Sequence, residues 1–237
     1  VTSGGGNTAV GYNSQNGLTS GSYNVGLGRD SLAANITGSY NVAIGAQSLA
    51  TSTGTAGNTA VGYNTLNVTT GAGHVAIGEY VLDANTTGTE NTAVGSYSMT
   101  HNSTGSGNTA VGRESLSKNT TASNNVVVGK LAMYTNTTGS QNTAIGTQAL
   151  RLNTTAGENV AVGYYALKAN TTASYNTAVG KDALTSNTTA IENTSVGYAS
   201  LYSNTTGANN VAMGSTTLYS NTTGANNTGL GKSALAA

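Results

Sequence analysis

The sequence predicts an all-β fold, a parallel β-solenoid (β-roll) of about 14 stacked 17-residue coils. Three observations predict it: a 17-residue unit repeats along nearly the whole 237-residue chain, apolar residues recur at fixed places in each copy, and a glycine follows each apolar group. A fixed period of this length is typical of a solenoid, in which each unit stacks only on its neighbours. The unit is rich in Thr, Gly, Asn and Val, which are poor helix formers, so a helical repeat is disfavoured.

Residues 142–158, NTAIGTQALRLNTTAGE, show the repeat clearly. Every step between copies is 17 residues, except that the fourth copy has 16. We therefore expect one repeat array over residues 1–237, a segment of a longer chain, with a local defect at the short copy. The copies begin at Asn7, Asn24, Asn41, Asn58, His74, Asn91, Asn108, Asn125, Asn142, Asn159, Asn176, Asn193, Asn210 and Asn227.

Positions 2 to 4 of the unit, such as residues 143–145, predict a short strand. Position 2 is Thr or Val, position 3 is mostly Ala, and position 4 is Val, Ile, Leu or Met. Alternate side chains of a strand share a face, so positions 2 and 4 should lie on one face and position 3 on the other. We expect position 4 to form one buried apolar column along the stack. Position 9, which is Leu or Met in thirteen copies, should form a second.

A glycine at position 5 ends each predicted strand. Glycine accepts a positive φ and a close approach of backbone without steric cost, and a corner stacked at the same place in every coil would require both. The predicted corner glycines are Gly11, Gly28, Gly45, Gly62, Gly78, Gly95, Gly112, Gly129, Gly146, Gly163, Gly180, Gly197, Gly214 and Gly231.

Positions 12 to 15 read Asn-Thr-Thr-Gly or Asn-Thr-Thr-Ala in most copies, and these are turn residues. Stacked asparagines can form hydrogen-bonded ladders along parallel, in-register strands. His74 replaces an asparagine at position 1, which favours a polar structural role for it. All charged residues and tyrosines fall at positions 6, 7, 10, 11 and 17, which we predict to be the exposed rim.

The same turns carry Asn-x-Ser/Thr sequons, the acceptor motif for N-linked glycans. Two interpretations stay open: dense glycosylation, or an asparagine ladder that happens to match the motif. Glycans on successive coils would be ~4.8 Å apart, which favours the ladder. Two further sequons, at Asn193 and Asn226, lie outside this turn. The candidate glycosylation sites are Asn35, Asn67, Asn85, Asn102, Asn119, Asn136, Asn153, Asn170, Asn187, Asn204 and Asn221.

The sequence NVAIG at residues 41–45, and NTAVG in other copies, resembles the repeats in the head domains of trimeric autotransporter adhesins. The fuller unit also resembles repeats in bacteriophage tail fibres and in large bacterial surface proteins. The resemblance implies a parallel β-roll in a homotrimer, located outside the cell, on a cell surface or on a virion. Its implied partners are other copies of the chain, in a homotrimer or end to end, and a surface carbohydrate or receptor.

Composition argues against several other functions. The formal net charge is zero and no basic stripe is present, which excludes an electrostatic footprint for nucleic acid. No apolar run is long enough to span a bilayer, so we expect no membrane insertion of this segment. The two histidines have no metal-site spacing, and no nucleophile has an evident base. We expect no enzyme activity, no catalytic or metal-binding residue, and no cofactor other than N-linked glycans.

The resulting hypothesis is a structural or adhesive extracellular fibre shaft that presents a rim of tyrosines and charges. One alternative is a heavily N-glycosylated secreted fibril, in which the protein is a scaffold for glycans. A second is a receptor-binding segment of a phage tail fibre. A third is an ice-binding solenoid that uses a threonine ladder, although adjacent threonines point to opposite faces and leave one column per coil.

Overall fold

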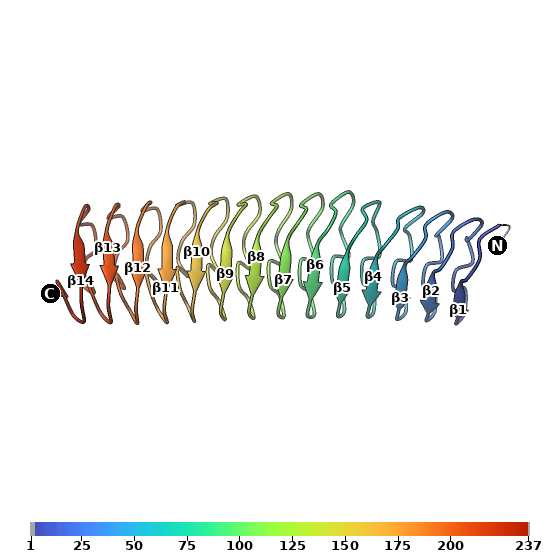
Figure 1. Ribbon diagram of the computed structural model, residues 1–237, viewed down its shortest axis with the longest axis horizontal. Coiled ribbons are helices and arrows are strands. Elements are labelled where there is room, and N and C mark those ends of the chain that lie inside the picture. The colour runs from blue at the N-terminus through green and yellow to red at the C-terminus, as the bar shows by residue number, and fades with distance from the viewer. Residues whose placement is uncertain (1–2, 237) are drawn as a thin grey trace. The chain divides into compact units, whose positions relative to one another are not determined.

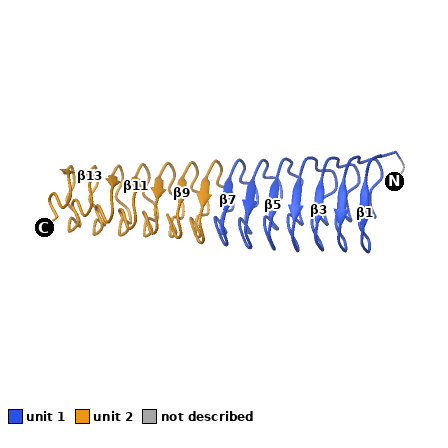
Figure 2. Cartoon of the chain, turned by 60° about the horizontal axis from the view of Figure 1, so that its bottom comes forward, with its two compact units in different colours: residues 1–121 blue, residues 122–237 orange. Residues whose placement is uncertain are grey.

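The computed structural model describes residues 3–236, which contain fourteen three-residue strands, one in each copy of the repeat. The chain divides into two compact units, residues 1–121 and 122–237 (Figure 2). Each unit is a parallel β-solenoid with the predicted spacing, which confirms the fold class. Residues 3–236 include no helix that is long and apolar enough to cross a membrane.

Unit 1 stacks its strands in chain order (Figure 1), with parallel pairing and position 2 opposite position 2. The strands are β1 (Thr8–Val10), β2 (Val25–Leu27), β3 (Val42–Ile44), β4 (Thr59–Val61), β5 (Val75–Ile77), β6 (Thr92–Val94) and β7 (Thr109–Val111).

Unit 2 repeats this arrangement with the same register. Its strands are β8 (Val126–Val128), β9 (Thr143–Ile145), β10 (Val160–Val162), β11 (Thr177–Val179), β12 (Thr194–Val196), β13 (Val211–Met213) and β14 (Thr228–Leu230).

The prediction that position 4 is buried is wrong. In β9 the small Ala144 is fully buried, whereas Ile145 is 39% exposed. The physical reason is the narrow interior. A Cβ built on Gly229, at position 3, would lie 3.3 Å from the Leu218 Cγ of the preceding coil. Position 3 therefore faces the leucine of the preceding coil and must be small. The alternation of the strand then places positions 2 and 4 outside.

The predicted column at position 9 is confirmed, since residues such as Leu150 and Leu167 are completely buried. Position 8, mostly Ser or Ala, is also buried beside it. Every coil from the second to the thirteenth thus buries one large apolar side chain at position 9, which stabilises it by roughly 2 kcal/mol. That is too little for a coil to fold alone, so the coils depend on their stacking.

The short fourth copy does not shift the register of the sheet. The pairing of β4 with β5 keeps its register, with Thr59 opposite Val75. The turn absorbs the missing residue: Thr69 is buried where other coils have asparagine, and its Oγ1 accepts a hydrogen bond from Asn85 Nδ2 at 2.9 Å. Asn67 consequently lies before the turn, half-buried, with its Nδ2 2.7 Å from Asn64 Oδ1.

Candidate functional site

Asparagines at position 1 form a ladder inside each unit. In unit 2 the backbone N–H of Asn159 donates to Asn142 Oδ1 at 3.0 Å, and its Nδ2 donates to the same oxygen at 3.2 Å. The next rung repeats this geometry, because the N–H of Asn176 donates to Asn159 Oδ1 at 2.9 Å. These side chains are buried, so each rung joins a coil to its neighbour where no water can substitute.

A second ladder runs along position 12. Asn153 Nδ2 donates to Asn136 Oδ1 of the preceding coil at 2.9 Å, and Asn170 Nδ2 donates to Asn153 Oδ1 at 3.1 Å. The two ladders meet at the carbonyl of position 15. The Ala156 oxygen accepts from Asn142 and from Asn153, each at 2.9 Å. One inward carbonyl oxygen therefore accepts a hydrogen bond from each of the two ladder asparagines of its coil.

This geometry argues against glycans at the predicted turn sites. Both hydrogens of Asn153 Nδ2, the atom to which a glycan would be joined, already donate inside the coil. A glycan there would break the ladder and would have no room. Asn67 and Asn221 are half-buried, and Asn67 lies outside the turn. The fully buried candidates are Asn35, Asn85, Asn102, Asn119, Asn136, Asn153, Asn170, Asn187 and Asn204.

His74 takes the place of an asparagine in the first ladder. The Asn91 backbone N–H donates to His74 Nδ1 at 3.2 Å, and the His74 N–H donates to Asn58 Oδ1 at 2.9 Å. The imidazole also hydrogen-bonds the Gly88 backbone at position 15. Burial lowers the pKa of His74, opposed by these backbone hydrogen bonds. The neutral ring thus substitutes for a carboxamide, and the predicted structural role is supported.

The glycines at position 5 all have positive φ, from 104° at Gly231 to 141° at Gly163. A Cβ built on Gly146 would lie 2.6 Å from the Gly163 carbonyl carbon, which real atoms do not tolerate. These residues therefore form the corners predicted for them. Positions 7, 9 and 17 also adopt left-handed φ, for example 59° at Gln148 and 51° at Leu150, which was not predicted from the sequence. Gly and Asn, the residues that most readily adopt left-handed φ, stand at position 17 in several copies and could have indicated this conformation there.

The outer face of the sheet is apolar. Positions 2 and 4 point away from the interior along every strand of unit 2, and Val126, Val128, Ile145, Val160, Val211 and Met213 are 36–45% exposed. Threonine hydroxyls at position 2 interrupt this surface at Thr143, Thr177, Thr194 and Thr228. Repeated exposed apolar residues on adjacent strands form a patch of the kind that marks an interaction surface.

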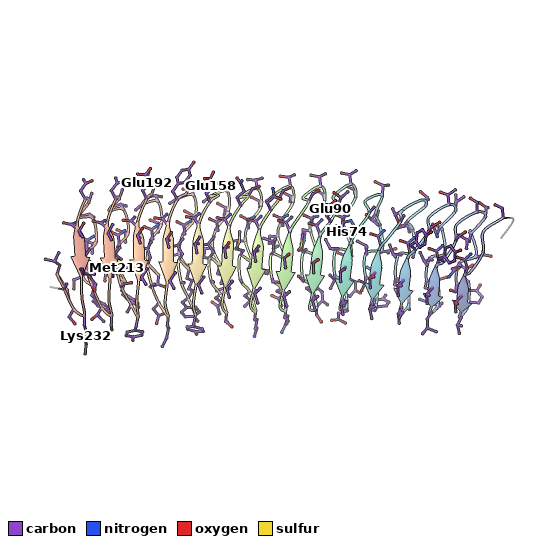
Figure 3. All side chains as sticks on the ribbon, viewed as in Figure 1. His74, Glu90, Glu158, Glu192, Met213 and Lys232 are labelled. Atoms are coloured by element: carbon purple, nitrogen blue, oxygen red, sulfur yellow. The ribbon has the colours of Figure 1, made fainter. Side chains whose placement is uncertain are left out.

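Opposite charges border this face in unit 2. Lys130, Lys181 and Lys232 occupy position 6, just beyond the corner glycine, and no acidic residue of unit 2 shares that position. Glu158 and Glu192 occupy position 17, just before the strand, with no basic residue there. Figure 3 shows both glutamates beyond one end of the strands and Lys232 beyond the other. We call these two rows the basic border and the acidic border.

Tyrosines gather in clusters on the rim. In unit 1 the Tyr80 ring stacks on Tyr97 and meets Tyr63 edge-on, with centroids 5.4 Å apart in both pairs. A hydrogen bond with Tyr63 raises the pKa of the Tyr80 hydroxyl. In unit 2 the Lys181 Nζ lies 5.7 Å from the Tyr198 ring centroid, a cation–π contact. Such clusters present flat aromatic faces to solvent.

Ion pairs on the rim form between residues that are adjacent in the sequence. Arg113 Nη2 lies 2.7 Å from Glu114 Oε1, and Arg29 Nε lies 3.3 Å from Asp30 Oδ2. Lys181 Nζ lies 3.8 Å from Asp182 Oδ2. The basic partners are largely exposed, so each pair contributes little to stability.

The Thr-Thr turn divides its two side chains. The Thr154 hydroxyl, at position 13, donates to the Thr171 carbonyl at 3.0 Å and is used within the stack. Its neighbour Thr155 is exposed, as are the equivalent residues of the following coils of unit 2. Each of these coils therefore contributes one outward threonine to a single column along the stack, as the ice-binding alternative assumed.

Among residues 3–236, no three His, Cys, Asp or Glu side chains come close enough to hold a metal ion. Comparison with protein-family models, with curated proteins and with solved structures gave no match.

Proposed function

We propose that this chain is a non-catalytic segment of an extracellular fibre, on a cell surface or a virion, that is stiffened from within and adhesive on its rim. The observation that carries the proposal is the pair of interior ladders. Coils such as residues 142–158 use two buried carboxamides and an inward carbonyl to hold their neighbours, through Asn142, Asn153 and Ala156. A chain that uses its buried polar groups for stacking is suited to bearing load along the stack.

The rim supports the adhesive part of the proposal. The tyrosines at Tyr63, Tyr80 and Tyr97 form one aromatic surface, and rings of this kind stack on the apolar faces of sugars. We further propose that the fibre contains several copies of the chain, as a homotrimer or joined end to end. A phage tail fibre that binds a receptor would use the same surfaces. The glycan-scaffold alternative loses support because its acceptor atoms lie inside the coils.

Adhesion of the full chain tests this proposal. Beads coated with the chain are exposed to immobilised chitin, mannan and heparin, and retention under flow is measured. The triple variant Tyr63→Ser, Tyr80→Ser, Tyr97→Ser should lose at least about 10-fold in retention, since stacking on each ring is worth about 1 kcal/mol. The matched control is Tyr12→Ser, which removes an exposed rim tyrosine for which the structure gives no ring contact. Equal retention of the triple variant and the wild type would contradict the adhesive role of the rim.

A further inference from the structure

We infer that the outer sheet face is where copies of this chain meet, and that the copies run parallel, with the acidic border of one against the basic border of the next. This inference rests on the proposed fibre function and specifies which surface is shared and in which orientation. Neither follows from the fold alone, because a stack of coils has several faces.

The apolar character of the face is the first step. Ile145 and Met213 remain 39% and 45% exposed at position 4, where a monomeric coil could carry polar residues without loss to its interior. The interior does not need these side chains, since Ala144 and Ala212 fill it from the same strands. An apolar column on the outer face is explained if another apolar surface covers it.

The occupant follows from charge. Glu158 and Glu192 are exposed, and neither has an ion-pair partner within residues 3–236. Across the same apolar face, the basic border offers Lys130 and Lys232, which are equally without one there. A second copy of the chain carries the complement of both rows, so the face and its borders match themselves.

The direction follows from symmetry. A second copy rotated about an axis parallel to the stacking direction faces the first with its borders exchanged, so acidic meets basic along both edges. A copy rotated about an axis parallel to the strands faces it with like charges opposed, which costs free energy. Any closed ring of parallel copies, including a trimer, places opposite borders together in the same way.

The register agrees with this arrangement. Glu192 and Lys181 belong to the same coil, residues 176–192, so parallel copies in register place one opposite the other. Glu158 lies in the coil that follows the one carrying Lys130. In unit 1 the acidic border carries Glu90 and the basic border carries Arg29 and Arg113, with Glu79 as an exception at position 6.

Charge reversal tests the pairing in the full chain. The double variant Glu158→Lys, Glu192→Lys makes both borders of unit 2 basic, and the dissociation constant measured by sedimentation equilibrium should rise at least about 10-fold. Adding Lys130→Glu, Lys181→Glu and Lys232→Glu exchanges the two borders of unit 2 and should restore association. Lys168→Glu, which lies on neither border, is the control and should leave the constant within about twofold. A monomeric wild-type chain, or unchanged association in the double variant, would overturn the inference.

Cross-linking tests the direction, and the chain has no cysteine of its own to interfere. Ser215 and Asn226 occupy positions 6 and 17 of one coil, on opposite borders. Chains carrying S215C mixed with chains carrying N226C should form the mixed disulfide dimer, and neither alone should form dimers. If each variant alone formed disulfide dimers and the mixture formed no S215C–N226C dimer, like borders would meet and the proposed direction would be wrong.

The two proposals fail separately. Monomeric chains that still adhere through the tyrosine surface would refute the shared face and keep the adhesive function. Parallel assemblies that bind none of the immobilised polysaccharides would refute the adhesive function and keep the shared face.

Discussion

Asparagine in a buried position is costly unless its carboxamide is fully hydrogen-bonded, and this chain satisfies that condition by repetition. The Asn153 side chain donates two hydrogen bonds and accepts one from Asn170 in the next coil, so each rung provides the acceptor for the next. At this scale the protein depends on side chains that can join a ladder: carboxamides in most coils, the neutral imidazole of His74 and the hydroxyl of Thr69. Substitution of one of these residues is therefore costly, because it leaves the buried polar group of its partner without a hydrogen bond.

His74 gives the first prediction, a local weakening in acid. Its pKa is lowered in the folded coil, so the unfolded chain, near pKa 6.5, takes up the proton first. The coil's stability should therefore be complete above about pH 6.5 and fall as the pH drops below that value. Exchange of the Asn91 backbone amide, which donates to His74 Nδ1, should accelerate as the pH falls from 7.5 to 5 after correction for intrinsic exchange.

The matched control is His74→Asn, which restores the residue that other coils carry. This variant should show no additional acceleration at Asn91 over that pH range. Identical pH profiles for the wild type and His74→Asn would contradict the assignment of the neutral ring to the ladder.

The coil is the next scale, and its corner is the least tolerant point. Gly146 has φ of 133°, and an added Cβ would meet the Gly163 carbonyl carbon at 2.6 Å. Gly139, at position 15, is also close to its neighbour, but Ala156 and Ala173 occupy that position in other coils. The chain itself therefore shows which glycine can carry a methyl group.

The second prediction compares these two glycines. Gly146→Ala should cost roughly 1–3 kcal/mol from backbone strain alone, and more because the next corner must shift. Gly139→Ala should cost less than about 1 kcal/mol. Urea unfolding of both variants provides the measurement, and equal costs would mean that the corner geometry is wrong.

The third prediction concerns which face of the strand and turn is inside. Leu150→Asp buries an unpaired charge and should cost more than about 4 kcal/mol, unfolding the neighbouring coils. Gln148→Asp, on the rim two residues earlier, should change the free energy of unfolding by less than about 0.5 kcal/mol. Within β9, Ala144→Asp should be as damaging as Leu150→Asp, while Ile145→Asp leaves the coil folded. If Ile145→Asp proved as destabilising as Ala144→Asp, the strand would face the other way.

The sequence sufficed to locate every strand, because period and β-branched residues coincide in each copy. It could not decide between the two faces of a strand whose faces are both apolar. Hydrophobicity favoured Val and Ile inside, but the available volume beside Leu150 and its equivalents requires alanine. The position 12 ladder followed from the turn composition. The displacement of Asn67 did not, because a one-residue deletion can be placed at several points of a turn.

At the scale of the whole molecule, the protein combines an interior of asparagine ladders with an exterior of apolar sheet face, tyrosines and bordering charges. The interior explains why eleven of the thirteen sequons arise without any need for glycans, since Asn and Thr are what the turn and ladders require; Asn67 and Asn226 lie outside both. The exterior explains why charges are few and sorted by position. A glycosylated fibril and an adhesive fibre differ most directly at the same atoms, the Nδ2 atoms of position 12.

The measurement that decides between them is peptide mass spectrometry of the folded chain secreted from a host that performs N-glycosylation. A synthetic peptide of residues 150–158 serves as the acceptor control, and Asn226, which is exposed, as a sequon outside the ladder. We expect unmodified asparagine at Asn119, Asn136, Asn153, Asn170, Asn187 and Asn204 in folded material. Glycans on these residues in a folded, stacked chain would place the ladder outside and contradict this expectation.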